Sequence, residues 1–135
     1  IRCGGVNKSN NPWLVGIENP LVDSLLVKKI ASKTILKNEA LATSGNYRNF
    51  RIEDNKVINH TFNPISGLPV ETNVLSVSVK SDECLVADAW ATALMVLPYE
   101  EGMEKVKNNE VIEALWVISE DNNTLKYYNS TGFFY

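Results

Sequence analysis

The sequence predicts a single α/β domain of the α+β kind, with a mixed but largely antiparallel sheet and a buried apolar helix. Short segments with strand character recur along the chain, and turn-forming residues separate them. The segment Cys84–Leu97 is apolar except at Asp88 and Thr92, and a segment this long that is apolar on every side is typical of a buried helix. An amphipathic segment, Glu100–Asn109, follows it as a second helix. No linker or repeat divides the sequence, so we expect one domain over residues 1–135.

The individual strands follow from alternation of side chains and from turn residues. Val74–Val79 shows the cleanest alternation, and Ser81 or Asp82 is placed to cap the helix that follows it. Ala40–Thr43 is a small apolar segment that leads into a turn at Ser44–Tyr47. The remaining predicted elements are two strands, a hairpin, an ordered loop and a terminal hairpin, at Trp13–Ile17, Val27–Leu36, Asn49–Ile52 with Val57–Asn59, Asn63–Pro69, and Ala114–Ser119 with Leu125–Tyr128.

Composition and charge are those of an ordinary soluble globular domain. The 135 residues are 44% hydrophobic and 21% charged, and the net charge of -3 gives no reason to expect nucleic acid or an acidic membrane surface as a partner. Cys3 and Cys84 match no metal-binding spacing, and Cys84 is expected to be a small buried apolar residue. No signal peptide or membrane segment is visible. The sequence begins at Ile1 without a Met, as expected of a piece from inside a longer protein.

Asp88 and Thr92 are candidate metal ligands. Residues four apart share one face of a helix, so the carboxylate and the hydroxyl point the same way. Two oxygen donors suit Mg²⁺, which often takes one or two protein ligands and completes its coordination with water and substrate phosphates. Alternatively, the helix dipole favours Asp88 near the helix start, and the Thr92 hydroxyl bonds back to the carbonyl of Asp88. The spacing alone leaves both interpretations open.

Two further segments hold polar residues with possible roles in binding and catalysis. In Ala42–Arg48, small hydroxyl residues and a glycine let backbone N–H groups approach a ligand, and Arg48 has the chemistry to pair with phosphate. The alternative is a plain transition from strand to turn. His60 is the one histidine in the sequence, and it precedes a loop stiffened by proline. It is suited to proton transfer near neutral pH, although a purely structural histidine is the alternative.

In this order and spacing, these segments resemble the FAD:protein FMN transferase family, also called the ApbE family. Five motifs carry the resemblance over nearly the whole length of the chain: Ile1–Gly5, Pro12–Ile17, Ala42–Arg48, His60–Pro69 and Ala87–Ala93. Members of the family are typically much longer than this chain. The resemblance therefore implies the C-terminal part of an ApbE-like fold, without the upstream segment that carries part of the flavin site.

The resemblance also implies a reaction. Family members bind FAD, attack its pyrophosphate and attach FMN through a phosphoester to a Thr or Ser hydroxyl of a target protein, with release of AMP. The implied side-chain ligands of Mg²⁺ are Asp88 and Thr92, and the remaining protein ligand is a backbone carbonyl from the absent N-terminal part. His60 is the implied group for proton transfer from the acceptor hydroxyl. The implied flavin-binding residues are Thr43, Ser44, Gly45 and Tyr47, with a phosphate-binding role inferred for Arg48 from its chemistry.

One residue departs from the family pattern. Asn63 stands just before Pro64, where the family usually has an aspartate. Asparagine keeps the size and an acceptor oxygen but loses the charge. If the aspartate orients the histidine, Asn63 weakens catalysis more than binding. If it only caps the turn Pro64–Gly67, asparagine is a good substitute.

Two alternatives to the transferase stay open at this stage. One is an FAD pyrophosphatase that gives AMP and FMN at the same metal site, with water as the acceptor. The other is a non-catalytic flavin-binding or partner-binding module, or an inactive fragment, which Asn63 and the absent upstream segment favour. The isolated chain is expected to have little or no activity, because a site assembled from two halves loses its positioning when one is absent.

The resemblance finally implies partners and a location. The expected partners are FAD, the missing N-terminal half of the same protein, and an acceptor protein. The acceptor is expected to be a subunit of a redox complex that presents a Thr or Ser in a short flavinylation motif. The expected location is the cell envelope, on the periplasmic side of the inner membrane as a lipoprotein whose anchor lies outside this chain.

Overall fold

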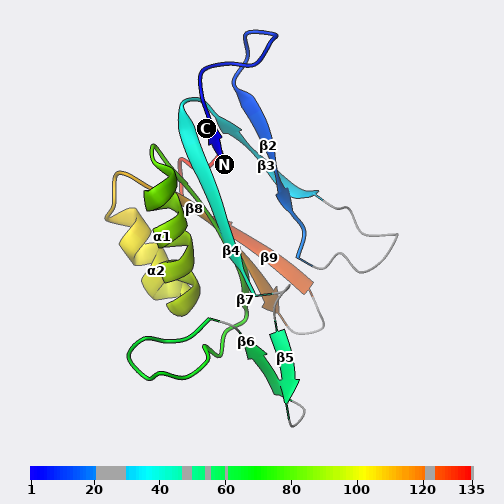
Figure 1. Ribbon diagram of the computed structural model, residues 1–135, viewed down its shortest axis with the longest axis vertical. Helices are drawn as coiled ribbons and strands as arrows, with labels where there is room; N and C mark the ends of the chain where they lie inside the picture. Colours follow the sequence, from blue (N-terminus) through cyan, green and yellow to red (C-terminus); the bar gives the residue numbers. More distant parts are fainter. Residues whose placement is uncertain (21–29, 47–49, 54–55, 60, 121–123, 135) are drawn as a thin grey trace.

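The structure is a computed structural model that describes residues 1–20, 30–46, 50–53, 56–59, 61–120 and 124–134. Within these ranges the chain forms a five-stranded sheet, two two-stranded ribbons and two helices. The strand pairings found among the described residues are antiparallel. The predicted α+β fold with a largely antiparallel sheet is therefore confirmed, and both helices lie together on one side of the main sheet (Figure 1).

The five-stranded sheet has the order β1-β4-β7-β8-β9. In chain order its strands are β1 (Arg2–Cys3), β4 (Glu39–Gly45), β7 (Val74–Ser81), β8 (Glu113–Glu120) and β9 (Thr124–Asn129). This confirms the predicted strand at Val74–Val79 and the predicted terminal hairpin. The predicted turn at Ser44 and Gly45 is wrong, because both residues pair with β7 as part of β4.

The central strand β7 is buried on both faces of the sheet. Val77 and Val79 belong to the core cluster beneath the helices. On the opposite face, the buried side chains are polar, at Ser76, Ser78 and Lys80. The Lys80 ammonium lies 3.6 Å from a carboxylate oxygen of Glu39, which compensates a charge that is almost fully removed from water.

Helix α1 (Cys84–Val96) packs across β4 and β7, and α2 (Tyr99–Lys107) follows it beside β8. The buried side chains of α1 are small or flexible, which lets the helix lie close to the sheet; they are Ala87, Ala91, Leu94 and Met95. In α2 the acidic residues of the first turn and the basic residues of the last turn both complement the helix dipole. The two predicted helices are confirmed to within two residues at each end.

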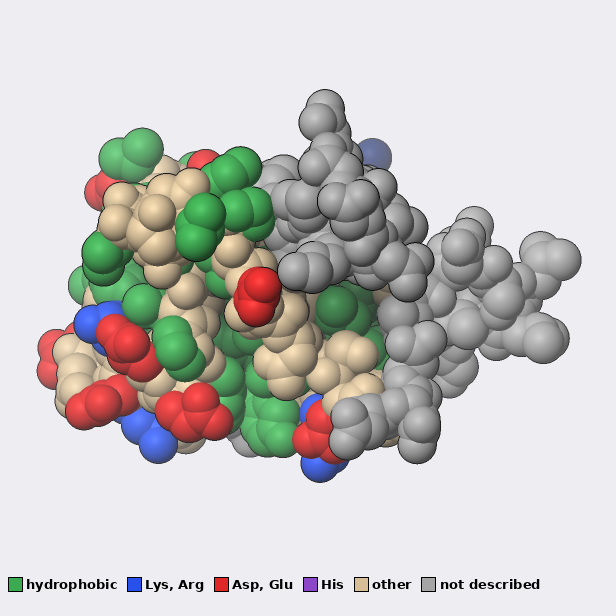
Figure 2. Space-filling view, turned by 90° about the horizontal axis from the view of Figure 1, so that it is seen from below, with side chains coloured by type: hydrophobic (Ala, Val, Ile, Leu, Met, Phe, Trp, Pro, Cys, Tyr) green, Lys and Arg blue, Asp and Glu red, His purple; other side chains and the backbone are tan. Residues whose placement is uncertain are grey.

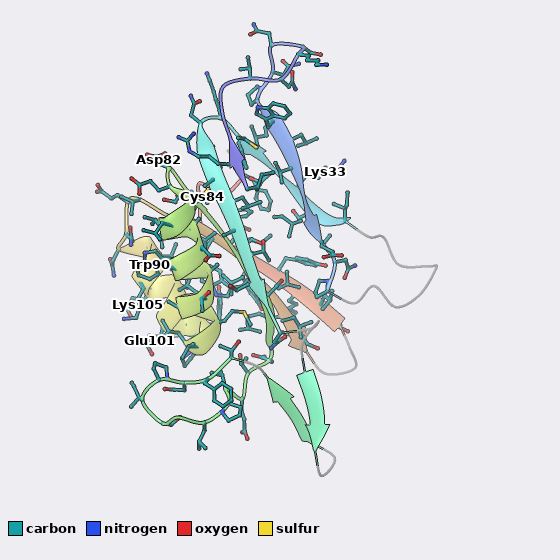
Figure 3. All side chains as sticks on the ribbon, in the orientation of Figure 1. Lys33, Asp82, Cys84, Trp90, Glu101 and Lys105 are labelled. Carbon is teal, nitrogen blue, oxygen red and sulfur yellow. The ribbon has the colours of Figure 1, made fainter. Side chains whose placement is uncertain are left out.

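The first helix, predicted to be buried, is buried on one side only. The sheet covers one side of α1 and leaves the other open, so the Leu85 side chain is 78% exposed. Cys84, predicted to be buried, is the first residue of the helix and is exposed (Figure 3). The exposed side of α1, which we call the open face, consists of Leu85, Asp88, Ala89, Thr92 and Ala93.

The predicted cap of α1 is also wrong. Ser81 is the last residue of β7, and Asp82 is exposed and lies one residue too early. The N-cap is Glu83, with extended backbone and no side-chain capping hydrogen bond. The start of α1 is therefore fixed by the packing of the helix on the sheet rather than by a side-chain cap.

The opposite face of the sheet is covered by the ribbon of β2 (Trp13–Glu18) and β3 (Ile30–Leu36). Residues from both ends of the chain share this second core cluster, which consists of Cys3, Ile17, Leu36, Leu41, Leu115 and Phe133. The Thr34 hydroxyl donates a hydrogen bond to the backbone carbonyl of Phe133 at 2.6 Å. The predicted strand at Val27–Leu36 is confirmed from Ile30 onward, and residues 27–29 lie outside the described residues.

The predicted central hairpin is confirmed as β5 (Phe50–Glu53) and β6 (Lys56–Asn59), which project from the lower end of the molecule in Figure 1. The loop predicted at Asn63–Pro69 follows it, and Phe62 and Pro69 form an isolated bridge across its base. Among the described residues, neither helix is long and apolar enough to cross a membrane.

Candidate functional site

Asp88 and Thr92 lie one helical turn apart on the open face of α1. Both are exposed because the buried side of the helix is the one formed by Ala87, Ala91 and Leu94. Within the described part of the chain, the structure shows no hydrogen bond or ion pair to the Asp88 carboxylate. A ligand that binds to the open face can therefore contact the oxygen atoms of both side chains.

The hydroxyl of Thr92 has a partner on the sheet. Its oxygen lies 3.2 Å from the hydroxyl oxygen of Ser44 in β4. Among the described residues, the structure shows this contact and no hydrogen bond from the Thr92 hydroxyl back to the carbonyl of Asp88. The contact brings one predicted flavin-binding residue, Ser44, to a predicted metal ligand that is 48 positions away in the sequence.

Thr43 lies on the other face of the sheet. Side chains alternate along a strand, so neighbouring residues of β4 point to opposite sides. The hydroxyl oxygen of Thr43 lies 2.8 Å from that of Ser78 in β7, away from the helices. Gly45 is the last residue of β4. The structure thus brings Ser44 to Thr92 but does not bring Thr43 to it.

Three predicted site residues, Tyr47, Arg48 and His60, lie outside the described residues. In the sequence, β4 ends two residues before Tyr47, and β6 ends one residue before His60. The predicted roles of these three residues stay predictions.

Asn63 caps the turn that follows it. Its side-chain oxygen accepts the backbone N–H groups of Ile65 at 2.9 Å and Ser66 at 3.4 Å. The Gly67 N–H donates to the backbone carbonyl of Asn63 at 2.8 Å, and Gly67 itself has a φ of 68°, which favours glycine. These hydrogen bonds support the alternative in which the residue before Pro64 caps the turn Pro64–Gly67.

The same loop exposes large apolar side chains. Ile65 is 96% exposed, and Phe62 and Leu68 are also mostly in water. Hydrophobic side chains reach the surface at this lower end of the molecule, and acidic side chains lie on the same face (Figure 2). The loop is therefore held by backbone hydrogen bonds and by the Asn63 side chain rather than by a core of its own.

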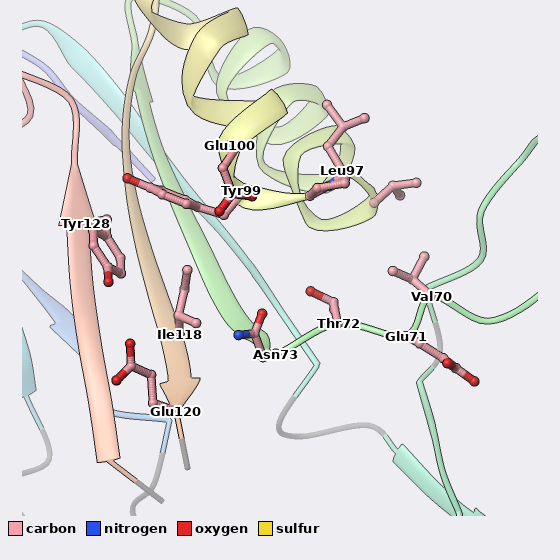
Figure 4. A pocket seen from close by; sticks show the side chains of 12 residues that line it. Val70, Glu71, Thr72, Asn73, Leu97, Tyr99, Glu100, Ile118, Glu120 and Tyr128 are labelled. Atoms are coloured by element: carbon pink, nitrogen blue, oxygen red, sulfur yellow. The ribbon is translucent and has the colours of Figure 1, made fainter.

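A cavity that the sequence does not predict lies between the start of α2 and the far edge of the sheet. It has a volume of about 460 Å³, and Tyr99, Tyr128, Asn73 and Glu120 are among the residues around it (Figure 4). The rings of Tyr99 and Tyr128 lie 4.8 Å apart between centroids. Burial, with smaller contributions from Tyr128 and Glu100, raises the pKa of Tyr99. No spacing in the sequence signals this cavity, because its residues come from four separate elements.

The residues at the open face fit Mg²⁺ by their chemistry. The described residues contain no group of three or more His, Cys, Asp or Glu side chains able to hold a metal ion. Mg²⁺ does not need such a group, because it often binds through one or two protein oxygens and keeps water or phosphate for the rest. Asp88 and Thr92 supply one carboxylate oxygen and one hydroxyl oxygen on an exposed surface, and two protein oxygens of this kind are sufficient for Mg²⁺.

Comparison with known proteins gives one consistent result. Residues 1–116 match the ApbE family. The FAD:protein FMN transferase of Vibrio cholerae serotype O1 is 36% identical over 131 residues, which are 97% of this chain and 38% of the relative. The enzyme of the same name from Escherichia coli K12 is 33% identical over 133 residues, which are 98% of this chain and 36% of the relative. The solved structure of the flavin transferase ApbE from Vibrio cholerae matches with a TM-score of 0.75 and 34% identity, over 98% of this chain and 40% of that one.

The family model and the matched structure agree on one family. The chain belongs to the ApbE family, and the predicted family is confirmed. It spans 38% and 36% of the lengths of the two relatives named above.

Proposed function

We propose that this chain is part of a flavin transferase that moves FMN from FAD to a Thr or Ser hydroxyl of an acceptor protein. The relatives named FAD:protein FMN transferase support the reaction class. The observation that carries the proposal is the pairing of the Ser44 and Thr92 hydroxyls beside Asp88 on the open face of α1. This pairing assembles two of the five motifs of the family at one place in the fold.

The proposed reaction is a phosphoryl transfer. The acceptor hydroxyl attacks the phosphorus on the FMN side of the FAD pyrophosphate, the bond from that phosphorus to the bridging oxygen breaks, and AMP leaves with the bond's electron pair. Mg²⁺ held by Asp88 and Thr92 would neutralise the charge of the pyrophosphate and of the departing AMP. The chain's own contribution is to fix these two oxygens on a helix that is packed against the sheet.

We assign proton transfer to His60. The attacking hydroxyl must lose its proton, and an imidazole with a pKa near neutral is suited to accept it. In the sequence, His60 directly follows β6 and lies three residues before Asn63, which caps the next turn. Gly45 and Tyr47 are proposed to contact the flavin, as the family resemblance implies, and Arg48 is proposed to pair with its phosphates because of the chemistry of the guanidinium group.

The acceptor and the location are proposed on the same basis. The acceptor is a redox-complex subunit that presents a Thr or Ser in a short motif, and the protein acts at the periplasmic side of the inner membrane as a lipoprotein. The exposed apolar side chains of the loop after Asn63 are consistent with a protein partner at this end of the molecule.

Product analysis of the complete gene product tests the proposal. The protein is incubated with FAD and Mg²⁺, with and without a candidate acceptor, and AMP and FMN are quantified. AMP release that requires the acceptor, with no free FMN, supports transfer. Stoichiometric AMP and free FMN without an acceptor would establish a pyrophosphatase. FAD binding without any AMP would establish a binding module.

The rate of AMP release in site variants and in a control variant tests whether the proposed residues catalyse the reaction. Asp88→Ala and His60→Ala are expected to lower AMP release by about 100-fold or more, because each removes a group that acts on the transition state. Glu104→Ala removes an exposed carboxylate from the neighbouring helix and is expected to leave the rate unchanged. Equal losses in all three variants would contradict the assignment.

A further inference from the structure

The contact between the Ser44 and Thr92 hydroxyls bears on how the Thr92 hydroxyl is oriented. A hydroxyl has one proton to donate and two lone pairs. A hydroxyl that binds a cation turns a lone pair toward the cation and directs its proton to another acceptor. The Ser44 oxygen, 3.2 Å from the Thr92 oxygen, is in position to be that acceptor. The Thr92 lone pairs then face the open side of α1, where Asp88 lies one turn earlier.

We propose that Ser44 is a positioning residue, whose hydroxyl accepts a hydrogen bond from the Thr92 O–H and so orients the Thr92 oxygen toward the metal. This inference rests on the proposed function, since it gives Ser44 a role toward the Mg²⁺ ligand rather than toward the flavin. Groups of this kind orient the ligands that touch the metal, and their loss typically lowers metal affinity by about 10- to 100-fold.

The position of Ser44 is fixed by the sheet. Ser44 pairs with Val77 in the central strand β7, and the side chain of Ser44 is half-buried. Two residues later, the buried side chain of Asn46 donates a hydrogen bond to the carbonyl of Val74 at 2.8 Å, and the Asn46 N–H donates to the carbonyl of Leu75 at 3.0 Å. These bonds hold the end of β4 in register, so the Ser44 hydroxyl reaches α1 from a rigid strand.

Mn²⁺ is a suitable probe, because it has ligand preferences similar to those of Mg²⁺ and its free aqueous form is quantified by electron paramagnetic resonance. The complete gene product is titrated with Mn²⁺ in the absence of flavin. We expect Ser44→Ala to weaken Mn²⁺ binding by about 10-fold or more, and Ser44→Thr, which keeps a hydroxyl, to restore it. Asp88→Ala is expected to abolish binding.

Ser78→Ala is the matched control. Ser78 makes a hydroxyl pair of the same kind with Thr43, at 2.8 Å, on the opposite face of the sheet. Its loss is expected to leave Mn²⁺ affinity unchanged. Thermal melting of each variant separates a loss of affinity from a loss of folding, and the Ser44→Thr rescue does so independently.

The possible failures are distinguishable. If Ser44→Ala binds Mn²⁺ like the wild type while Asp88→Ala does not, the positioning role is wrong and the proposed metal site stands. If Ser44→Ala lowers the affinity for FAD measured without metal but not that for Mn²⁺, Ser44 is a flavin contact and the inference is overturned. If the wild type binds no Mn²⁺, the metal role of Asp88 and Thr92 fails together with the inference.

Discussion

The side-chain oxygen of Asn63 accepts the backbone N–H of Ile65 at 2.9 Å, and this bond ties the residue before Pro64 to the turn that follows it. An aspartate at position 63 would offer a carboxylate oxygen at the same place. The residue that departs from the family pattern therefore performs a task that both side chains can perform.

Asn63→Asp is expected to change the rate of FMN transfer by no more than roughly threefold, because the turn is capped equally well by either side chain. Asn63→Ala is expected to destabilise the protein by about 1 kcal/mol, since it leaves two backbone N–H groups without this partner. Transfer kinetics and chemical denaturation measure the two effects. A rate increase of about tenfold or more in Asn63→Asp would show instead that a carboxylate is needed to activate the histidine.

Ala91→Leu is expected to destabilise the fold by about 1–3 kcal/mol, because Ala91 is fully buried where α1 lies against the sheet and a larger side chain overpacks that contact. Denaturant unfolding measures the change. Ala93→Leu on the open face is the matched control, with an expected change of at most about 0.5 kcal/mol. Equal effects at the two positions would contradict the packing of α1.

Gly132→Ala is expected to destabilise the C-terminal turn. An added Cβ would meet the carboxylate of Glu113, which accepts hydrogen bonds from the Ser130 hydroxyl and, at 3.0 Å, from the Gly132 N–H. Displacing the carboxylate weakens both bonds, at a cost of about 1–3 kcal/mol. The melting temperature measures this loss, and Thr131→Ala, an exposed neighbour, serves as the control. An unchanged melting temperature in Gly132→Ala would mean that Glu113 moves aside without cost.

Tyr99 is expected to make folding stability fall at alkaline pH. Burial raises its pKa above the ordinary value of 10.0, so the folded protein holds this proton more tightly than the unfolded chain does. The resulting stability is fully present below pH 10.0 and is lost as the pH rises through the folded pKa. Unfolding of wild type and Tyr99→Phe is compared across this range. The variant should lose less stability, and an identical pH dependence would contradict the assignment.

The sequence was most predictive where local pattern and tertiary packing agree. The alternation in Val74–Val79 identified β7 because both faces of that strand are used in the fold. The apolar character of Cys84–Leu97 identified α1 but not its exposure, since composition does not say how much of a helix a sheet will cover. Alanines on the open face count as apolar in the pattern yet lie in water.

The sequence predicts which residues are candidates for the site, but it does not predict which of them lie close together in the fold. Asp88 and Thr92 share a face because helical spacing requires it. The turn predicted after Thr43 is instead a continuation of β4, and strand alternation then sends Thr43 and Ser44 to opposite faces. The cap of α1 was missed for a similar reason, since Ser81 is held in the sheet by its pairing with Ala40.

Asp88 is proposed to serve a reaction that attaches FMN covalently to a protein. The most direct measurement is the intact mass of an acceptor protein after incubation with the complete gene product, FAD and Mg²⁺. We expect a mass gain equal to one attached FMN, which is absent when the enzyme carries Asp88→Ala and present when it carries Glu104→Ala. An acceptor that gains FMN at the wild-type rate with Asp88→Ala, or that gains none with the wild-type enzyme, would contradict it.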